Sequence, residues 1–263
     1  MLNGAEALLA VTCIKNRYFP IEPDVMDLIL IALAPVVIIA FYIWFRDKYE
    51  QEPLQPLLYS LGAGILIVIP IITVEGLLSE LVGSLDRISG AAYHAFVVAG
   101  FTEELFKYLA LVLLIWKSPH FNDKYDGIVY ATFVSLGFAG AENVMYVLHN
   151  GLATGLMRAF TAVPAHAIFG ITMGYYFGMA RFYPKREREL KRKALWIPIL
   201  LHGIYDFILM TEIAWLWSVF ILFVIYLYVI GLRRMKVLSV QSYYRTDYEL
   251  LNRKFGGPAD MHR

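Results

Sequence analysis

Long apolar segments separated by short polar ones dominate the chain between residues 25 and 232. Seven of them approach or exceed the length that a helix needs to cross a bilayer, which is about 20 residues. They cover approximately residues 25–45, 56–82, 91–116, 127–149, 156–180, 194–211 and 213–232. Membrane-spanning barrel strands would be about ten residues long and would alternate in polarity, unlike these segments. The pattern predicts an all-α, polytopic transmembrane helical bundle of about seven spans.

The two ends of the chain are more polar than this apolar region. We expect an N-terminal segment at residues 1–24, a transmembrane domain at 25–232 and a short soluble tail at 233–263. The lysine and arginine side chains near the span ends lie mostly on one side of the predicted bundle. That side has Arg46, Lys48, Lys117, Lys124, Arg181, Lys185, Arg186, Arg188, Lys191, Arg192, Lys193, Arg233, Arg234 and Lys236, and the other has Lys15, Arg17, Arg87 and Arg158. Because cytoplasmic loops carry the excess of basic residues, we expect the N-terminus outside and the tail in the cytoplasm.

Composition agrees with a bilayer as the surroundings of the chain. Apolar residues make up 59% and charged residues 17% of the sequence, against about 45–50% and 25% in soluble domains. The net charge of +1, with no basic face apart from one loop, argues against a nucleic-acid partner. The single cysteine excludes an internal disulfide and a cysteine-based zinc cluster.

The third apolar segment carries charges near its middle, at Glu103, Glu104 and Lys107. Each charged residue at the centre of a span costs about 2.5–3.5 kcal/mol, more than several leucines return. The charges must therefore face the protein interior, pair with one another or be neutralised. Lys107 follows the two glutamates by four and three residues, so a helix brings it between them. A buried ion-pair cluster that only fixes packing is the alternative, but it would leave one acid unpaired.

The next three segments contain matching polar residues. Glu142 and Asn143 lie within the fourth segment, and His166 lies within the fifth. In the sixth, His202 and Asp206 are four residues apart, so the aspartate can orient the imidazole. Four successive spans with an acid or a histidine at comparable depth favour a polar cavity over isolated core residues.

Carboxylates and imidazoles around a cavity suit the activation of water. A glutamate can act as general base, and histidines can bind zinc or stabilise an oxyanion. The HExxH motif of zinc proteases is absent. We expect Glu75 and Glu80 to reach interfacial water and His94 to lie nearer the outer mouth, without a catalytic role.

The motif EELFK, from Glu103 to Lys107, resembles the EExxK motif of the PrsW family of intramembrane proteases. Further matches are DGIVYATFVSLGFAGAENVMY at 126–146, with Phe138 and Glu142 in an FxxxE spacing, His166 with Gly170, and His202 with Asp206. The resemblance covers about residues 25–232. More distantly, the chain is similar to CAAX-type prenyl endopeptidases, whose motif has an arginine one residue later than Lys107.

This resemblance implies a hydrolase of the bacterial cytoplasmic membrane, an intramembrane endopeptidase of the metallo- or glutamate type. It implies site-1 cleavage of a membrane-spanning anti-sigma factor in a stress response, with 25–232 as the protease domain. The implied catalytic residues are Glu103 as general base, Glu104 assisting it, Glu142 as third ligand or second acid, and His166 and His202 as metal ligands or oxyanion donors. The implied supporting residues are Lys107, Asn143 and Asp206.

Two questions stay open at the level of sequence. Glu142, His166 and His202 would suit a catalytic Zn²⁺ with one open position, but a metal-free glutamate mechanism uses the same residues. The other functions considered are a prenyl endopeptidase or peptide-immunity protease of the same broad superfamily and, from another class, a proton-coupled transporter. Carboxylates and histidines at mid-membrane also form proton relays, although the chain lacks the internal repeat that transporters usually show.

Overall fold

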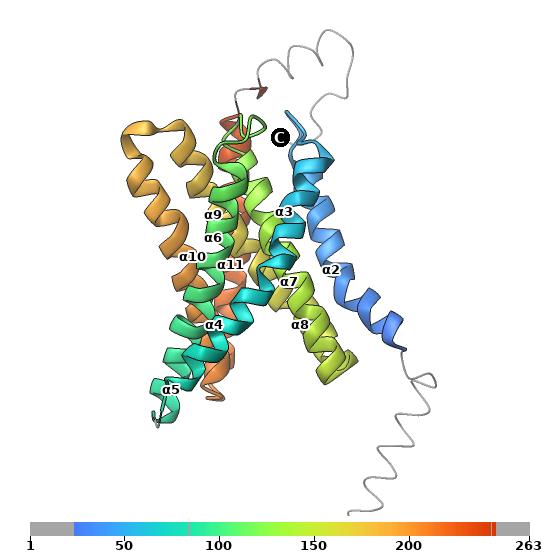
Figure 1. Cartoon of the computed structure of the whole chain (residues 1–263), viewed down its shortest axis with the longest axis vertical. Helices are drawn as coiled ribbons and strands as arrows, with labels where there is room; N and C mark the ends of the chain where they lie inside the picture. Colours follow the sequence, from blue (N-terminus) through green and yellow to red (C-terminus); the bar gives the residue numbers. More distant parts are fainter. Residues whose placement is uncertain (1–23, 84, 243, 246–263) are drawn as a thin grey trace, which may run out of the picture.

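The computed structural model describes residues 24–83, 85–242 and 244–245, and in these residues the chain is helical with no strand. The long helices run broadly along one axis as a bundle (Figure 1). The prediction of an all-α polytopic bundle is confirmed. Nearly all of the expected N-terminal segment (1–24) and the end of the expected tail (246–263) lie outside the described residues.

The helices follow one another along the chain with short connections. They are α2 (Val25–Arg46), α3 (Leu54–Leu66), α4 (Val68–Glu80), α5 (Arg87–Tyr93), the π-helix η1 (His94–Phe101), α6 (Thr102–Ile115), α7 (Asp126–Asn150), α8 (Leu152–Phe160), α9 (Ala162–Phe182), the 3-10 helix η2 (Pro184–Arg186), α10 (Glu187–Met210) and α11 (Leu216–Val240).

Within the described residues, six helical stretches are long and apolar enough to cross a membrane. They are Val25–Arg46, Leu54–Glu80, Asp126–Asn150, Leu152–Phe182, Pro184–Met210 and Leu216–Val240. The third predicted span corresponds to α5, η1 and α6, which follow one another without interruption from residue 87 to residue 115. This run is long enough to cross a membrane. Because of Glu103, Glu104 and Lys107, however, its composition is too polar for it to be counted among the six apolar stretches.

Two helices extend beyond the predicted spans because polar residues continue them. Helix α10 begins at Glu187, and the (i, i+4) pairs Glu187–Lys191 and Glu189–Lys193, at 2.7 and 2.6 Å, stabilise its first turns. Helix α11 continues to Val240, eight residues past the expected end of its span at 232.

Helix α7 is the central helix of the bundle. The structure buries 78% of its span, against 17% for α2 and for α11. Glycines allow the close packing, since a Cβ atom added to Gly137 would overlap the carbonyl oxygen of Leu61 in α3. The polar residues of α7 are therefore held at fixed positions inside the protein.

The π-helix η1 lies directly before the two glutamates of α6. It ends at Phe101, and α6 begins at Thr102. Gly100 in η1 comes close to the backbone of α10, because an added Cβ would lie 3.1 Å from the nitrogen of Gly203 and 3.2 Å from the oxygen of Ile199. The tight contact brings the start of α6 beside the histidine of α10, and π-helical turns are frequent at such functional positions.

Candidate active site

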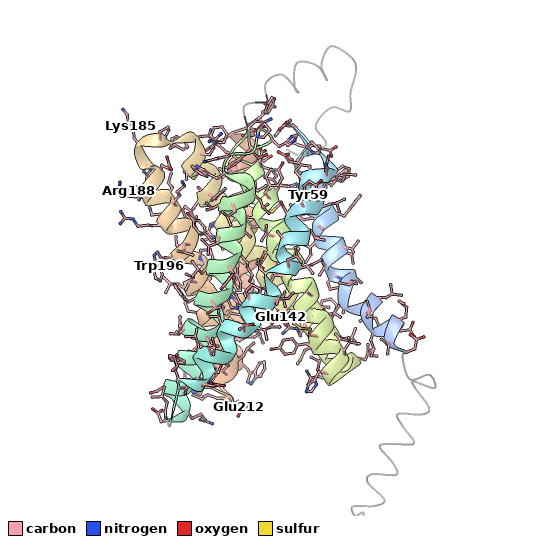
Figure 2. All side chains as sticks on the ribbon, in the orientation of Figure 1. Tyr59, Glu142, Lys185, Arg188, Trp196 and Glu212 are labelled. Atoms are coloured by element: carbon pink, nitrogen blue, oxygen red, sulfur yellow. The ribbon has the colours of Figure 1, made fainter. Side chains whose placement is uncertain are left out.

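A cavity of about 460 Å³ lies among α4, η1, α6, α7, α8, α9, α10 and α11. Charged and imidazole side chains line it, including Glu103, Glu142, Arg158, His166, His202 and Asp206. Figure 2 shows Glu142 in the lower half of the bundle, nearer the end that carries Glu212 than the end that carries Lys185 and Arg188. The cavity thus lies off-centre along the long axis of the bundle.

The three charges of α6 form one buried cluster. Lys107 Nζ donates to Glu103 Oε2 at 3.0 Å and to Glu104 Oε1 at 2.8 Å, as the spacing predicts. It also lies 4.1 Å from the ring centroid of Phe138 in α7. Glu103 lines the cavity, whereas Glu104 is fully buried behind it. The two adjacent glutamates therefore differ in their access to substrate and water.

His202 in α10 faces a carboxylate on each side of its ring. Its Nδ1 lies 3.0 Å from Glu104 Oε1, and its Nε2 lies 3.1 Å from Asp206 Oδ2. The ring stacks on Phe169 of α9, with centroids 4.9 Å apart. Asp206 thus fixes the ring one helical turn away, as the (i, i+4) spacing predicts.

His166 in α9 is held in the same way by residues of α7. Its Nε2 donates to Glu142 Oε2 at 3.0 Å, and its backbone carbonyl accepts a hydrogen bond from Ser135 Oγ at 2.6 Å. Its Nδ1 lies 3.3 Å from Lys107 Nζ. Glu142 is thereby a partner of the outer nitrogen of the ring.

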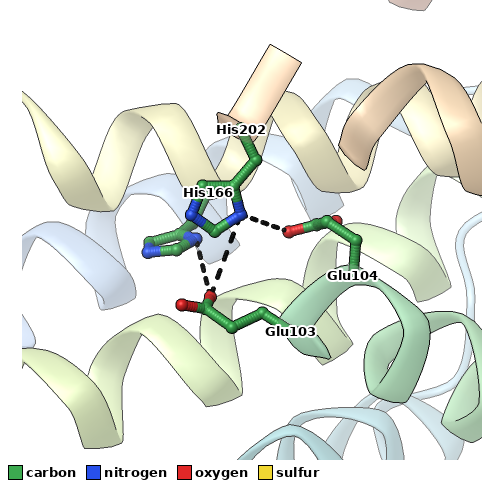
Figure 3. Close-up of side chains that lie close together, drawn as sticks. All are labelled: Glu103, Glu104, His166 and His202. Atoms are coloured by element: carbon green, nitrogen blue, oxygen red, sulfur yellow. Dashed lines mark hydrogen bonds and ion pairs between the residues drawn. The ribbon is translucent and has the colours of Figure 1, made fainter. Parts of the chain in front are cut away.

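The two histidines converge on one oxygen of Glu103. The Nδ1 atoms of His166 and His202 each lie 4.0 Å from Glu103 Oε2 (Figure 3). Donor atoms of Glu103, Glu104, His166 and His202 all lie within 4.8 Å of one another, and all four residues are buried. Glu142 does not belong to this group, although the sequence suggested it as a ligand with the two histidines.

The chemistry of this group fits a metal ion. Imidazole nitrogens and carboxylate oxygens are ligands of Zn²⁺, and metal-binding histidines usually donate their second nitrogen to a carboxylate. Glu142 and Asp206 occupy that second position on the two rings. In addition, Oε2 of Glu104 is buried and has no hydrogen-bond partner among the described residues.

The sequence analysis missed Arg158 of α8, which it counted only as one of the few basic residues on its side of the bundle. Arg158 donates to Glu142 Oε2 at 2.6 Å and, through Nε, to Asn143 Oδ1 at 3.0 Å. Asn143 in turn donates to the carbonyl of Ala32 at 2.9 Å. Asn143 thus lies behind the site and holds Arg158 rather than facing the histidines. The one feature of the sequence that could have indicated a role for Arg158 is that it is among the few basic residues on the less basic side of the predicted bundle.

Glu75 and His94 also line the cavity, next to the residues that the sequence analysis singled out. The sequence had assigned them to interfacial water and to the outer mouth. Helix α4 packs against η1, and η1 packs against α10, the helix that carries His202.

Comparison with known proteins agrees with these observations. The family described as PrsW family intramembrane metalloprotease matches residues 52–232. A protein named Protease PrsW from Clostridioides difficile (strain 630) is 40% identical over 217 residues, which cover 80% of this chain and 91% of the relative. Another with that name, from Bacillus subtilis (strain 168), is 36% identical over 206 residues, or 78% of this chain and 92% of the relative. No solved structure matches the chain.

These matches decide between the classes that the sequence had left open. A peptidase is supported by the family and by every relative named above, and a transporter is not. Several apolar helices, a buried acid–histidine cavity and this match agree on a multi-pass membrane hydrolase. The chain belongs to the PrsW family of intramembrane metalloproteases.

Proposed function

We propose that peptide-bond hydrolysis takes place at Glu103, which acts as the general base for the attacking water. The observation that carries this proposal is the convergence of two histidine Nδ1 atoms on Glu103 Oε2, at 4.0 Å each, beside a cavity. Glu104 is fully buried and does not itself line the cavity, although it contacts His202, which does. Glu103 is therefore the α6 carboxylate that can reach a water molecule on the substrate side.

We assign the metal ligands to His166, His202 and Glu104. Two histidines and a glutamate are a ligand set of catalytic zinc sites that keep one position open, and Glu104 Oε1 lies 3.0 Å from Nδ1 of His202. When bound, Zn²⁺ would polarise the scissile carbonyl and make its bound water nucleophilic at neutral pH. In this proposal Glu142 orients His166, in place of the ligand role that the sequence suggested.

The residues of the chain have separate tasks in the reaction. Glu103 accepts a proton from the attacking water and returns it to the leaving amine. Lys107 lies within 3.0 Å of both glutamates and balances their charge while Glu103 is ionised. Asp206 keeps His202 in one orientation.

We further propose that the substrate is a membrane-spanning anti-sigma factor, cut at site 1. The family resemblance supports this role, and the position of the cavity is compatible with it. The basic residues Lys185 and Arg188 lie at one end of the bundle and Glu142 nearer the other (Figure 2). If the basic end faces the cytoplasm, with the N-terminus outside and the C-terminus inside, the cavity lies in the outer half of the bilayer. The first cut would then fall in the outer half of the substrate span.

The test uses purified full-length protein in proteoliposomes with an anti-sigma factor encoded in the same genome. Wild type and a matched control, Glu80→Gln at an exposed carboxylate on α4, are expected to cut the substrate in the outer half of its span. Glu103→Gln is expected to give no product by mass spectrometry. Cleavage by Glu103→Gln at the wild-type rate would refute the base assignment. Cleavage of other spans, but not of the anti-sigma factor, would refute the substrate.

A further inference from the structure

A second group of buried acids lies in the α2–α3 connection and at the start of α7, and it shares no residue with the catalytic cavity. Oxygens of Glu50, Glu52 and Asp126 lie within 4.8 Å of one another. Glu52 is 3% exposed and Asp126 1% exposed. In Figure 1 the α2–α3 connection lies at the upper end of the bundle, opposite α5. Of the three acids, only Asp126 falls within a stretch that matches the family, as its first residue, and the proposed reaction uses none of them.

Each of the three carboxylates is held by one of its two oxygens. The Tyr130 hydroxyl donates to Glu52 Oε2. The backbone N–H groups of Asn122 and Asp123 donate to Asp126 Oδ2 at 2.8 and 2.6 Å. The side-chain Nδ2 of Asn122 donates to Glu50 Oε1 at 3.3 Å. These bonds fix the orientation of all three groups, as the outer partners of a metal site do.

The second oxygen of each carboxylate has no such donor. Glu50 Oε2, Glu52 Oε1 and Asp126 Oδ1 are all buried and accept no hydrogen bond from the described residues. Among those residues, no lysine or arginine nitrogen lies within ion-pair distance of the three groups. Burying a carboxylate oxygen without a cation or a hydrogen-bond donor costs free energy. A positively charged partner would therefore stabilise this group.

A fourth acid increases this cost. Asp47, the residue after α2, is 5% exposed, and its Oδ2 accepts from the backbone N–H of Glu52 at 3.3 Å. Burial raises the pKa of Asp47 to about 8, and repulsion from neighbouring carboxylates adds to the rise. Burial likewise raises the pKa of Glu52 to about 8. In both groups burial is the main cause of the higher pKa, and the charge of neighbouring carboxylates adds to it.

We propose that Glu50, Glu52 and Asp126 bind one hard divalent cation of the Mg²⁺, Ca²⁺ or Mn²⁺ class. All ligands offered are carboxylate oxygens, which these ions prefer, and no imidazole or thiolate that would favour zinc takes part. The cation joins the α2–α3 connection to the N-terminal end of α7, the central helix. It is a structural site, separate from the catalytic histidines.

The test measures thermal unfolding of the purified full-length protein in detergent, after removal of metals by a chelator. Mg²⁺, Ca²⁺ or Mn²⁺ is added in turn. For wild type, Tm is expected to rise by about 5 °C or more with at least one cation at roughly a hundred times its Kd. Glu52→Gln and Asp126→Asn are expected to lose the rise. The exposed control Glu80→Gln and the catalytic variant Glu104→Gln are expected to keep it.

A second readout covers variants that fold poorly. Glu50 is only half-buried, so Glu50→Gln should fold, and electron paramagnetic resonance should count one Mn²⁺ fewer than in wild type. The proposal is overturned if no cation raises the wild-type Tm, or if Glu52→Gln and Asp126→Asn keep the full rise. It is also overturned if Glu104→Gln alone loses the rise, because the cation then binds at the catalytic histidines.

Discussion

His166 Nε2 lies 3.0 Å from Oε2 of Glu142, on the side of the ring away from Nδ1. The contact joins α9 to α7, and it leaves Nδ1 directed toward the α6 carboxylates. A histidine on a helix can rotate about its side-chain bonds, so an outer partner is needed to hold one ring orientation. The same oxygen of Glu142 accepts from Arg158, which keeps the carboxylate itself in position.

Glu142→Ala should therefore lower kcat/KM by about 10- to 100-fold, the usual effect of removing the outer partner of a metal-binding histidine. Glu142→Gln should keep part of the activity, because its amide oxygen still accepts from His166. Initial rates on a membrane-spanning substrate check both values. Equal rates for Glu142→Ala and wild type would contradict the orienting role.

Asp206 should act on His202 in a comparable way, through the contact of 3.1 Å. Asp206→Leu should reduce kcat/KM by about 10- to 100-fold and weaken Zn²⁺ binding by a similar factor. The control is Glu80→Leu, at an exposed residue of α4, which should retain wild-type values. Zinc affinity from competition with a chromogenic chelator distinguishes ring orientation from a general loss of structure, which near-ultraviolet circular dichroism would detect.

Contacts within one helix could be predicted from the sequence, whereas most contacts between helices could not. The Lys107 pairs and the His202–Asp206 pair follow from spacings of three and four residues. The pairing of Glu142 with His166 depends on how α7 and α9 pack, and hydrophobic periodicity does not specify this because both helices are apolar all round. The sequence therefore supplied most residues of the site and the contacts within one helix, but not the contacts between helices.

The contacts of Arg158 are the hardest to predict from the sequence. It belongs to α8, a short helix joined to α9 at Thr161, and its side chain folds back onto α7. Hydropathy predicts one span from about 156 to 180 and treats its first residues as an end. In α6 the charged residues made the site easy to find in the sequence. The same charges made the helix less apolar, so it is not among the six stretches that could span a membrane by composition.

Metal removal tests the ligand assignment directly. Exhaustive chelation of wild type should abolish cleavage, and added Zn²⁺ should restore it. The reason is that bound Zn²⁺ would polarise the carbonyl of the substrate and make the attacking water more nucleophilic. His166→Ala and His202→Ala should show no restoration. If chelated protein with no residual zinc by mass spectrometry remains fully active, the assignment of a zinc site to His166, His202 and Glu104 is wrong.

Close helix packing around α7 should depend on Gly137. Gly137→Ala should lower the free energy of unfolding by roughly 1–3 kcal/mol, since the new methyl group would overlap the Leu61 carbonyl. The matched control is Gly62→Ala in α3, where an added Cβ meets no atom within 4 Å. That substitution should be neutral or slightly stabilising, because alanine favours helices by about 1 kcal/mol over glycine. Thermal unfolding in detergent compares the two, and equal Tm values would contradict the packing account.

Lys107 tests whether the charges of α6 stabilise one another. Lys107→Met leaves two buried carboxylates without their cation, and breaking such a pair typically costs about 3–5 kcal/mol. The double variant Glu104→Gln/Lys107→Met removes one of these charges, so it should recover part of the lost stability. It should not recover activity, because Glu104 is a proposed metal ligand. Thermal unfolding and cleavage rates measured on the same preparations separate the two effects. A double variant less stable than Lys107→Met would show that the cluster is not held together by this charge balance.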